Sequence, residues 1–406
     1  MGSKKITYSE IENKGMGFYG LFGLLGFFLL AGGIAFFTAE HNGHHITGMN
    51  NQVVWGLPHV FAIFLVVAAS GALNIASIGT VFGKKIYQPL GRLSGLMAIA
   101  LLVGGLIILV LDLGRADYLI EMMKGDLNFK SVFAWNMILY GGFVTIVGFY
   151  LWTMMSRSKL AKKLYRPVGI SALAWRLMLT TGTGSIFGFL VSRQAYDAAI
   201  LAPLFIILSF AIGLAFFITV LMFTYKCTDR NLGNILLNKL RYLLSVFILA
   251  VLLFEATRHL ANLYATEHHA VEAFMLAGGN IFSSLFWYGY VVVGTVLPLV
   301  LIFCRKLKDN RASLVIAAIL TMLGGFSLLY VIIIGGQAFP LVLFPNAEVS
   351  SSYFDGVMNT YSASLWEVML GVAGVALTLL VILVGVKVLR FLPESLADSV
   401  VDPHAK

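Results

Sequence analysis

Charge is scarce in this sequence. Charged residues make up only 12% of the 406 residues, whereas 59% are hydrophobic. A soluble domain could not hide so much apolar surface, so the composition excludes an ordinary soluble protein. Long apolar runs separated by short charged loops instead predict an all-α polytopic protein of the lipid bilayer. These runs are continuous rather than alternating, which does not fit a membrane β-barrel.

Cysteine is almost absent as well. The two cysteines, Cys227 and Cys304, lie far apart, each beside a basic loop. Without a CxxC or CxxCH motif, the chain encodes no iron–sulfur cluster, no c-type haem and no cysteine-based zinc site. The clustered histidines of the loops show no fixed ligand spacing, so we expect no metal site.

Histidine is also missing from the middle of the apolar runs. Only His59 and His259 are near such runs, and both are near the ends of them. A b-type haem held deep in the membrane by two histidines is therefore excluded, whereas one shallow haem b is not.

The apolar runs predict about ten transmembrane helices, because each has roughly the 20 residues that a bilayer requires. The first run begins near Gly17, and we interpret it as a retained anchor helix rather than a cleaved signal. The expected spans cover residues 17–38, 56–79, 91–111, 132–154, 168–190, 199–225, 241–262, 280–303, 312–334 and 364–389.

Lys and Arg are distributed unequally between the two sets of loops. Of the 28, Arg176 lies inside the fifth span and only five lie in one set of loops: Arg115, Lys124, Lys130, Arg193 and Arg258. The rest lie in the other set, which includes both termini. This asymmetry predicts cytoplasmic termini in the inner membrane of a bacterium. The net charge of +9 is then mainly a matter of topology, and no nucleic-acid partner is needed to explain it.

The order of the spans suggests a duplication. Spans two to five and six to nine would form two four-helix bundles with the same orientation, flanked by the first and last helices. We therefore expect an anchor helix and outer loop (1–55), a first bundle (56–198), a second bundle (199–334), and an outer loop with the last helix and cytoplasmic tail (335–406).

At the outer end of the second helix of each bundle, an acidic residue is followed three residues later by an arginine. The pairs are Asp112 with Arg115 and Glu255 with Arg258. On a helix this spacing places both groups on one face. The pairs could be structural ion pairs that fix the helix ends, or carboxylates that transfer protons.

His59 stands at the mouth of the second span, after Pro58, which suits the first turn of a helix. It could be an ordinary interfacial residue. It could also hydrogen-bond the ring carbonyl of a quinone and exchange a proton near neutral pH. Other polar residues that could line an outer cavity are Arg193, Gln194, His259 and Glu367. Glu367 could equally be a charge partner for the start of its helix.

Four segments together resemble the NrfD/PsrC-like family, the membrane subunits of polysulfide-reductase-type oxidoreductases, in its longer, HybB-like branch. The resemblance covers nearly the whole chain. It is carried by "WGLPHVFAIFLVVAASGA" (Trp55 to Ala72), "LDLGRADYL" (Leu111 to Leu119), "NFKSVFAWN" (Asn128 to Asn136) and "SLFWYGYVVVGTVLPL" (Ser284 to Leu299).

The resemblance implies a subunit of a respiratory or sulfur-metabolism complex. Such a subunit exchanges electrons between menaquinone or ubiquinone and a periplasmic, ferredoxin-like iron–sulfur subunit, alongside cytochrome and further membrane subunits. It implies quinone contacts by His59, Trp55, Asn136 and Tyr140. Proton transfer would involve Asp112, Arg115, Glu255 and Arg258.

Two other classes of function use the same residues. A transporter would need polar groups near the bilayer midplane and broken helices. A scaffold that anchors peripheral subunits would explain the long outer loops but not the acid–arginine pairs.

Overall fold

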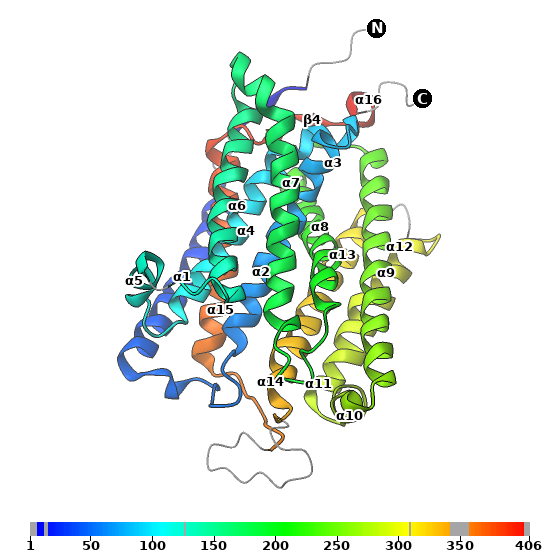
Figure 1. The fold of residues 1–406 in the computed structure, drawn as a ribbon. Coiled ribbons are helices and arrows are strands. Elements are labelled where there is room, and N and C mark those ends of the chain that lie inside the picture. The colour runs from blue at the N-terminus through cyan, green and yellow to red at the C-terminus, as the bar shows by residue number, and fades with distance from the viewer. Residues whose placement is uncertain (1–5, 12–14, 126, 308–309, 342–356, 402–406) are drawn as a thin grey trace.

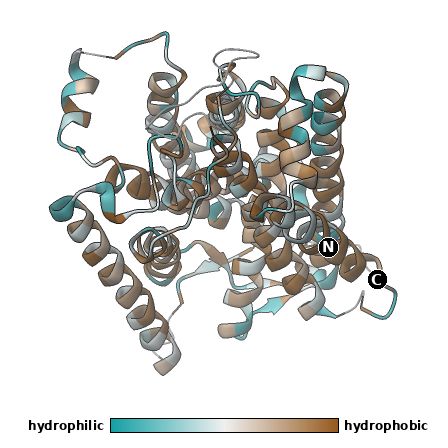
Figure 2. Cartoon of the chain, turned by 90° about the horizontal axis from the view of Figure 1, so that it is seen from below, coloured by the Kyte–Doolittle hydropathy of each residue, from teal (hydrophilic) through white to brown (hydrophobic). Residues whose placement is uncertain are grey.

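The computed structural model describes residues 6–11, 15–125, 127–307, 310–341 and 357–401. In this part of the chain the protein is a bundle of long helices, and the only strands are two pairs of two-residue segments. Figure 1 shows the long helices running side by side. Hydrophobic residues cover most of their length, and hydrophilic residues concentrate on connecting segments (Figure 2). The predicted all-α polytopic membrane fold is confirmed.

The long helices follow the apolar runs of the sequence closely. They are α1 (Met16–Asn42), α2 (Leu57–Ala72) continued by α3 (Asn74–Thr80), α4 (Gly91–Leu111), α6 (Val132–Met155), α7 (Lys159–Gly188), α8 (Leu201–Cys227), α9 (Asn234–Tyr264), α13 (Arg311–Tyr330) and α15 (Leu365–Val388). One further span combines α11 (Ile281–Ser284), a π-helical segment (Leu285–Val296) and α12 (Leu297–Phe303). A second π-helical segment (Val331–Gly335) extends α13 into the short α14 (Gly336–Ala338).

Nine of these spans in the described part of the chain are long and apolar enough to cross a membrane. The exception is α7, because Arg176 and the stretch from Thr180 to Ser185 lower its hydropathy. It is nevertheless a 30-residue helix packed between α6 and α8. The first and last described segments lie at the same end of the bundle (Figure 1), which requires an even number of crossings. We therefore count α7 as the tenth span.

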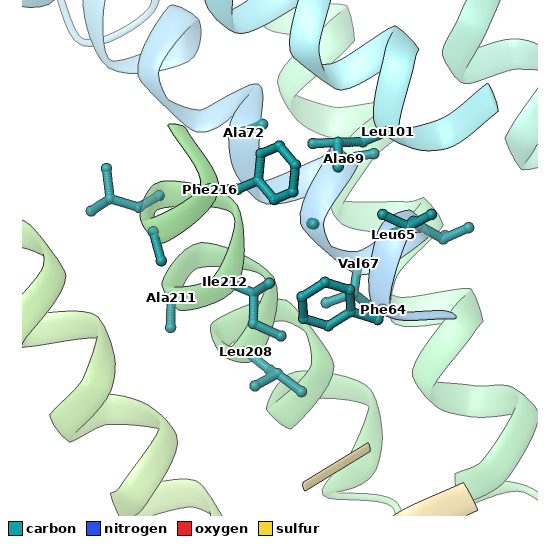
Figure 3. Close-up of a cluster of buried hydrophobic side chains, with 14 of the residues drawn as sticks. Phe64, Leu65, Val67, Ala69, Ala72, Leu101, Leu208, Ala211, Ile212 and Phe216 are labelled. Atoms are coloured by element: carbon teal, nitrogen blue, oxygen red, sulfur yellow. The ribbon is translucent and has the colours of Figure 1, made fainter. Parts of the chain in front are cut away.

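Helix α2 lies at the centre of the packing. It contacts α4 on one side and α8 on the other, and nearly all of its residues are buried. Phe64 and Leu65 of α2, Leu101 of α4, and Ile212 and Phe216 of α8 meet in one apolar cluster (Figure 3). This burial on all sides explains why the apolar residues of α2 follow no amphipathic period.

The remaining contacts divide the helices into two sets. Helices α2, α4, α6 and α7 pack on one another, whereas α9 and the α11–α12 span pack with α8 and α13. Helix α1 packs mainly on α15, and α15 packs on α2 and α4. We call residues 56–198 the first unit and residues 199–334 the second unit, and α8 contacts helices of both.

The end of the bundle near the termini is closed by short strands. Strand β1 (Tyr8–Ser9) pairs with β3 (Leu392–Pro393), and β2 (Asn231–Leu232) pairs with β4 (Ser395–Leu396). The Arg230 guanidinium donates to backbone carbonyl groups of both terminal segments. We call this the terminal end and the opposite one the outer end.

The span made by α2 and α3 is interrupted at Leu73. The Ser94 hydroxyl of α4 fills the gap, because it donates to the Ala72 carbonyl (2.7 Å) and accepts from the Ala76 amide (3.1 Å). These two backbone groups would bond each other in an unbroken helix. In lipid such groups need a protein partner, and Ser94 provides it.

The crossing of α2 and α8 generates a stability prediction. A Cβ atom on Gly213 would lie 2.3 Å from the Ala72 nitrogen, so Gly213→Ala should push the two backbones apart. We expect a loss of about 1–3 kcal/mol, measured as a lower thermal unfolding temperature in detergent. Gly141→Ala is the matched control, because a Cβ atom added there would meet nothing within 4 Å. It should keep or raise the unfolding temperature, since alanine favours helix. Equal losses in both variants would contradict the close crossing.

Candidate functional site

His59 and Asp112 meet at the outer end of the first unit. His59 lies in the first turn of α2, directly after Pro58, and Asp112 caps the end of α4. The His59 Nδ1 atom is 2.9 Å from Asp112 Oδ2, an ion-pair distance, although the two groups are not aligned as an ideal hydrogen bond. A carboxylate at the C-terminal end of a helix is electrostatically unfavourable. The contact with His59 therefore stabilises a carboxylate whose side chain is only 5% exposed.

Arg115 does not pair with Asp112, so that expectation was wrong. Helix α4 ends at Leu111, and Gly114 takes a positive φ of 72°. The turn removes Arg115 from the helical spacing, and its guanidinium instead binds Asp117 (3.0 Å) on the surface. This exposed pair lowers the pKa of Asp117 through its hydrogen bond.

The segment before α2 is held by Gln337 of α14. The Gln337 Oε1 atom accepts hydrogen bonds from the Val54 and Trp55 amides (both 2.9 Å). Its Nε2 atom donates to the Trp55 carbonyl (3.0 Å). Arg193 donates to the carbonyls of Gln337 and Gln52 (both 3.1 Å), so it braces the same segment. Burial lowers the pKa of Arg193. Arg193 thus braces the segment that carries Trp55; its place in an outer cavity stays a prediction.

Glu367 connects the start of α15 to the segment before α2. It forms a capping box with Ser364 and also accepts from the Gly48 amide (2.8 Å). The Tyr361 hydroxyl donates to Glu367 Oε1 (2.6 Å) and accepts from the Leu57 amide (2.7 Å). Burial and then the hydrogen bond to Glu367 raise the pKa of Tyr361. Glu367 therefore has a structural role at its helix start.

Trp55 packs into an aromatic cluster rather than standing free. Its ring lies 5.6 Å from that of Phe187, 5.9 Å from Phe133 and 6.3 Å from Tyr196, measured between centroids. These residues come from α6, α7 and the α7–α8 connection. The cluster builds an aromatic wall beside the first turn of α2, four residues before His59.

Asn136 and Tyr140 belong to the contact between α6 and α7. The Asn136 Oδ1 atom accepts from the Thr183 hydroxyl at 3.5 Å, and the Tyr140 ring is buried. Thr183 is also a hydrogen-bond neighbour of Tyr140. Gln194, in contrast, follows Arg193 with a buried Oε1 atom that has no partner in the described residues.

A second polar cluster lies at the outer end of the second unit. Arg258 Nη2 is 2.5 Å from Glu255 Oε1, so this acid–arginine pair forms as expected. His259 uses both ring nitrogens: Nε2 is 3.1 Å from Glu255 and Nδ1 is 2.6 Å from Glu272. Asn262 completes the set by donating to Glu272 (2.7 Å). All five side chains are almost fully buried.

The second cluster borders an unusual helix. Tyr290 lies in the π-helical segment, and its buried hydroxyl has no hydrogen-bond partner among the described residues. It helps to line a small cavity with Thr295, Thr321 and Gly294, with space for about one water molecule. A π-helix inside a span often accompanies a functional site.

His259 does not fit as a haem ligand. Both nitrogens of His259 are engaged by carboxylates, so neither can ligate an iron without breaking the cluster. In the described residues no group of three or more His, Cys, Asp or Glu side chains is arranged to hold a metal ion. His259, one of the two histidines near an apolar run, is therefore not free to hold the shallow haem that the sequence left open.

Three important residues were missed in the sequence. Gln337 follows an apolar run in "GGQAFP", and Tyr361 and Glu272 lie in long outer loops. Each is a lone polar residue without a motif, and its partners lie in other helices. The only signal was their place on the outer side, which they share with many exposed residues.

The long apolar helices and the His59–Asp112 pair at one end of the bundle define a polytopic membrane protein with ionisable groups gathered at one surface. The family model "Polysulphide reductase, NrfD" matches residues 45–341. The chain belongs to this NrfD family, as the sequence resemblance implied.

Curated relatives agree over most of the sequence. The "Hdr-like menaquinol oxidoreductase integral membrane subunit" of Archaeoglobus fulgidus is 26% identical over 98% of this chain and 99% of its own. A subunit of the selenate reductase of Mesobacillus selenatarsenatis is 22% identical over 84% of this chain and 85% of its own. A polypeptide of the polysulfide reductase of Wolinella succinogenes is 23% identical over 71% of this chain and 96% of its own. All three names describe parts of larger oxidoreductase complexes.

Arg258 and Arg115, the arginines of the two predicted acid–arginine pairs, should respond differently to mutation. Arg258→Ala leaves the Glu255 carboxylate buried without its arginine, and we expect a loss of about 3–5 kcal/mol in unfolding free energy. Arg115→Ala removes an exposed partner of Asp117 and should leave the unfolding temperature unchanged. Thermal unfolding of both purified variants checks this. Comparable loss in Arg115→Ala would contradict the surface placement of that residue.

Glu272 gives a pH-dependent prediction. Burial is the largest single effect and raises its pKa, but the hydrogen bonds from His259 and Asn262 and the charges of His259 and Arg258 together outweigh it and hold the pKa below the ordinary value of 4.5. The ionised carboxylate thus stabilises the fold fully above pH 4.5, and this stabilisation is lost as the pH falls through the lowered pKa. Glu272→Gln should therefore lower the unfolding temperature at pH 7, and the difference from wild type should shrink below pH 4.5.

The matched control for this series is Glu267→Gln, which changes an exposed carboxylate nearby in the same loop. It should leave the unfolding temperature at pH 7 unchanged. A constant difference between wild type and Glu272→Gln from pH 7 to pH 3 would show that the charge of Glu272 is not what matters.

Proposed function

We propose that the chain is the quinone-reactive membrane subunit of a multi-subunit oxidoreductase, and that the quinone head group binds beside His59. The observation that carries this proposal is the His59–Asp112 contact at the outer end of the first unit. Membership of the NrfD family and the menaquinol oxidoreductase relative support it.

In this proposal the two nitrogens of His59 have different tasks. Asp112 engages Nδ1 and thereby orients the ring, which leaves Nε2 to hydrogen-bond a quinone oxygen. Oxidation of a bound quinol would release two electrons, which leave to a partner subunit, and two protons, of which His59 would accept one and water at the outer end the other. His59 accepts a proton from the quinol hydroxyl, and Asp112 stabilises the resulting imidazolium. The aromatic cluster around Trp55 shields the ring, and Asn136 with Tyr140 contributes further polar contacts.

The electrons need a partner, because this chain has no motif for an electron carrier of its own. We propose a periplasmic, ferredoxin-like iron–sulfur subunit that docks on the outer end, with cytochrome and further membrane subunits in the same complex. The segment from Glu40 to Ala62 is similar to the membrane subunit DsrP of a sulfur-metabolism complex, which supports a role in sulfur metabolism. The terminal end then faces the cytoplasm of a bacterial cell, as its basic loops predict.

The second cluster adds a proton-transfer role to this proposal. Glu255, Arg258, His259 and Glu272 form a connected set of ionisable groups that Tyr290 extends toward the water-sized cavity. Such a set can take up and release a proton when the charge nearby changes. We assign it to proton transfer in the second unit, apart from the quinone contact.

One observation favours transport as a second candidate. Span two is broken at Leu73, and the polar side chains Asn74 and Arg176 lie beside the break. Broken helices and polar groups near the midplane are features of transporters. The family match and the His59–Asp112 contact at the outer end favour the quinone-linked function instead.

A titration with a fluorescent quinol-site inhibitor tests the proposed site. The purified protein should quench the inhibitor fluorescence saturably, and His59→Ala should weaken binding about tenfold or more, because a charge-assisted hydrogen bond is lost. His45→Ala, an exposed loop histidine, is the matched control and should bind like wild type. Unfolding temperatures of all three proteins establish that they are folded.

Two results would overturn parts of this proposal. Saturable binding that is unchanged in His59→Ala would keep the quinone function but place the site elsewhere. No saturable binding by the folded wild type would reject the quinone function and favour the transporter.

A further inference from the structure

Arg176 is a buried cation without an acidic partner. Its side chain is 1% exposed, and no Asp or Glu among the described residues forms an ion pair with it. Its Nη2 atom donates to Asn74 Oδ1 (2.9 Å), its Nη1 atom donates to the Ser70 carbonyl (3.4 Å), and the Phe210 ring lies 5.1 Å from Cζ. All these partners are neutral, so its full positive charge acts on the surrounding interior.

This charge lies near the middle of the membrane. The apolar part of α7 begins after Pro167, and nine residues of helix place Arg176 about 13 Å further along the axis. The hydrocarbon core is about 30 Å thick. A cation at this depth is costly, and such residues in spans usually serve a function.

A trail of polar groups leads to Arg176 from the terminal end. Thr80 donates to the Tyr165 hydroxyl (2.7 Å) and is also bonded to Tyr150. Tyr150 in turn donates to the Ala76 carbonyl (3.3 Å). Asn74, the partner of Arg176, lies two residues before Ala76 in the sequence. The trail therefore reaches the centre of the first unit through buried hydroxyl groups and the Ala76 carbonyl near the helix break.

A similar trail continues from Arg176 to the outer end. The Ser70 hydroxyl lies 3.4 Å from that of Thr180 and donates to the Arg176 carbonyl (3.2 Å). One turn further along α7, Thr183 donates to Asn136. Hydroxyl and amide groups of this kind bind water molecules in a protein interior, and such water can pass protons. The first unit thus has polar groups along most of its depth, with a fixed positive charge at its centre.

We propose that Arg176 is an electrostatic barrier that stops protons from crossing the first unit. An unpaired cation in a low-dielectric interior repels a hydrated proton strongly at short distance. The same principle excludes protons and cations from pores lined by arginine. Protons released at the outer end of the first unit are thereby kept from leaking back through it to the terminal end. The barrier needs no bound quinone, so it stands or falls independently of the proposed function.

The test measures proton permeability in liposomes that contain the purified full-length chain and a trapped pH-sensitive dye. A potassium gradient with valinomycin drives proton entry. Wild type should be tight, and Arg176→Gln, which keeps hydrogen-bonding capacity but removes the charge, should admit protons at least about tenfold faster. Arg176→Lys keeps the charge and should stay tight.

A second variant keeps Arg176 and neutralises its positive charge with a neighbouring carboxylate. Asn74→Asp places a carboxylate next to Arg176 Nη2, which neutralises the charge while strengthening the local contact. It should also leak, even if Arg176→Gln does not fold. Thr180→Val in the Asn74→Asp background should reduce the leak, because it removes a hydroxyl from the path without changing its size.

A purely structural role for Arg176 predicts different results. In that case Asn74→Asp remains tight, and Arg176→Gln loses stability without gaining proton permeability. A tight, folded Asn74→Asp protein would therefore overturn the barrier. Equal leakage in Arg176→Lys and Arg176→Gln would overturn it too, because the charge would then not be the cause.

Discussion

The structure depends on the absence of water from the bilayer core, which leaves every buried polar group to find its partner within the protein. Ser94 fills the break at Leu73 for this reason, and Gln337 satisfies the backbone of the segment before α2. The same constraint brings His59 and Asp112 together at the outer end. The polar side chains of this protein therefore satisfy its buried backbone groups and also form its ionisable contacts.

The two units handle charge in opposite ways. The second unit compensates its buried acids with Arg258 and His259, so charges of both signs lie in contact and can exchange a proton. The first unit holds an arginine that has only neutral partners. A compensated cluster responds to small changes in its surroundings, whereas a lone fixed charge imposes one sign of potential on its neighbourhood. The two units thus differ in how they stabilise buried charge.

The sequence predicted the helices well, because a span needs about 20 apolar residues and such runs are visible without an alignment. It also placed His59, Trp55 and Arg193 at outer span ends, where the structure has them, whereas their shared role stays a prediction. It was wrong for Arg115. Helix α4 ends at Leu111, one residue before Asp112, and the turn at Gly114 then carries Arg115 away from that acid. It could not find Gln337, Tyr361 or Glu272, because their importance comes from contacts between residues that are distant in the sequence. Periodicity and motifs do not report such contacts.

The anchoring of α2 also has a consequence for how the protein is made. The segment before His59 is held by Gln337, at the end of the ninth span, and Leu57 is held by Tyr361, just before the tenth. Spans enter the membrane in order during synthesis. The hydrogen-bond partners of the first turn of α2 are therefore made only when nearly the whole polypeptide has been synthesised. The outer end is therefore completed last, and a protein truncated before Gln337 would insert its early spans and still lack a formed site around His59.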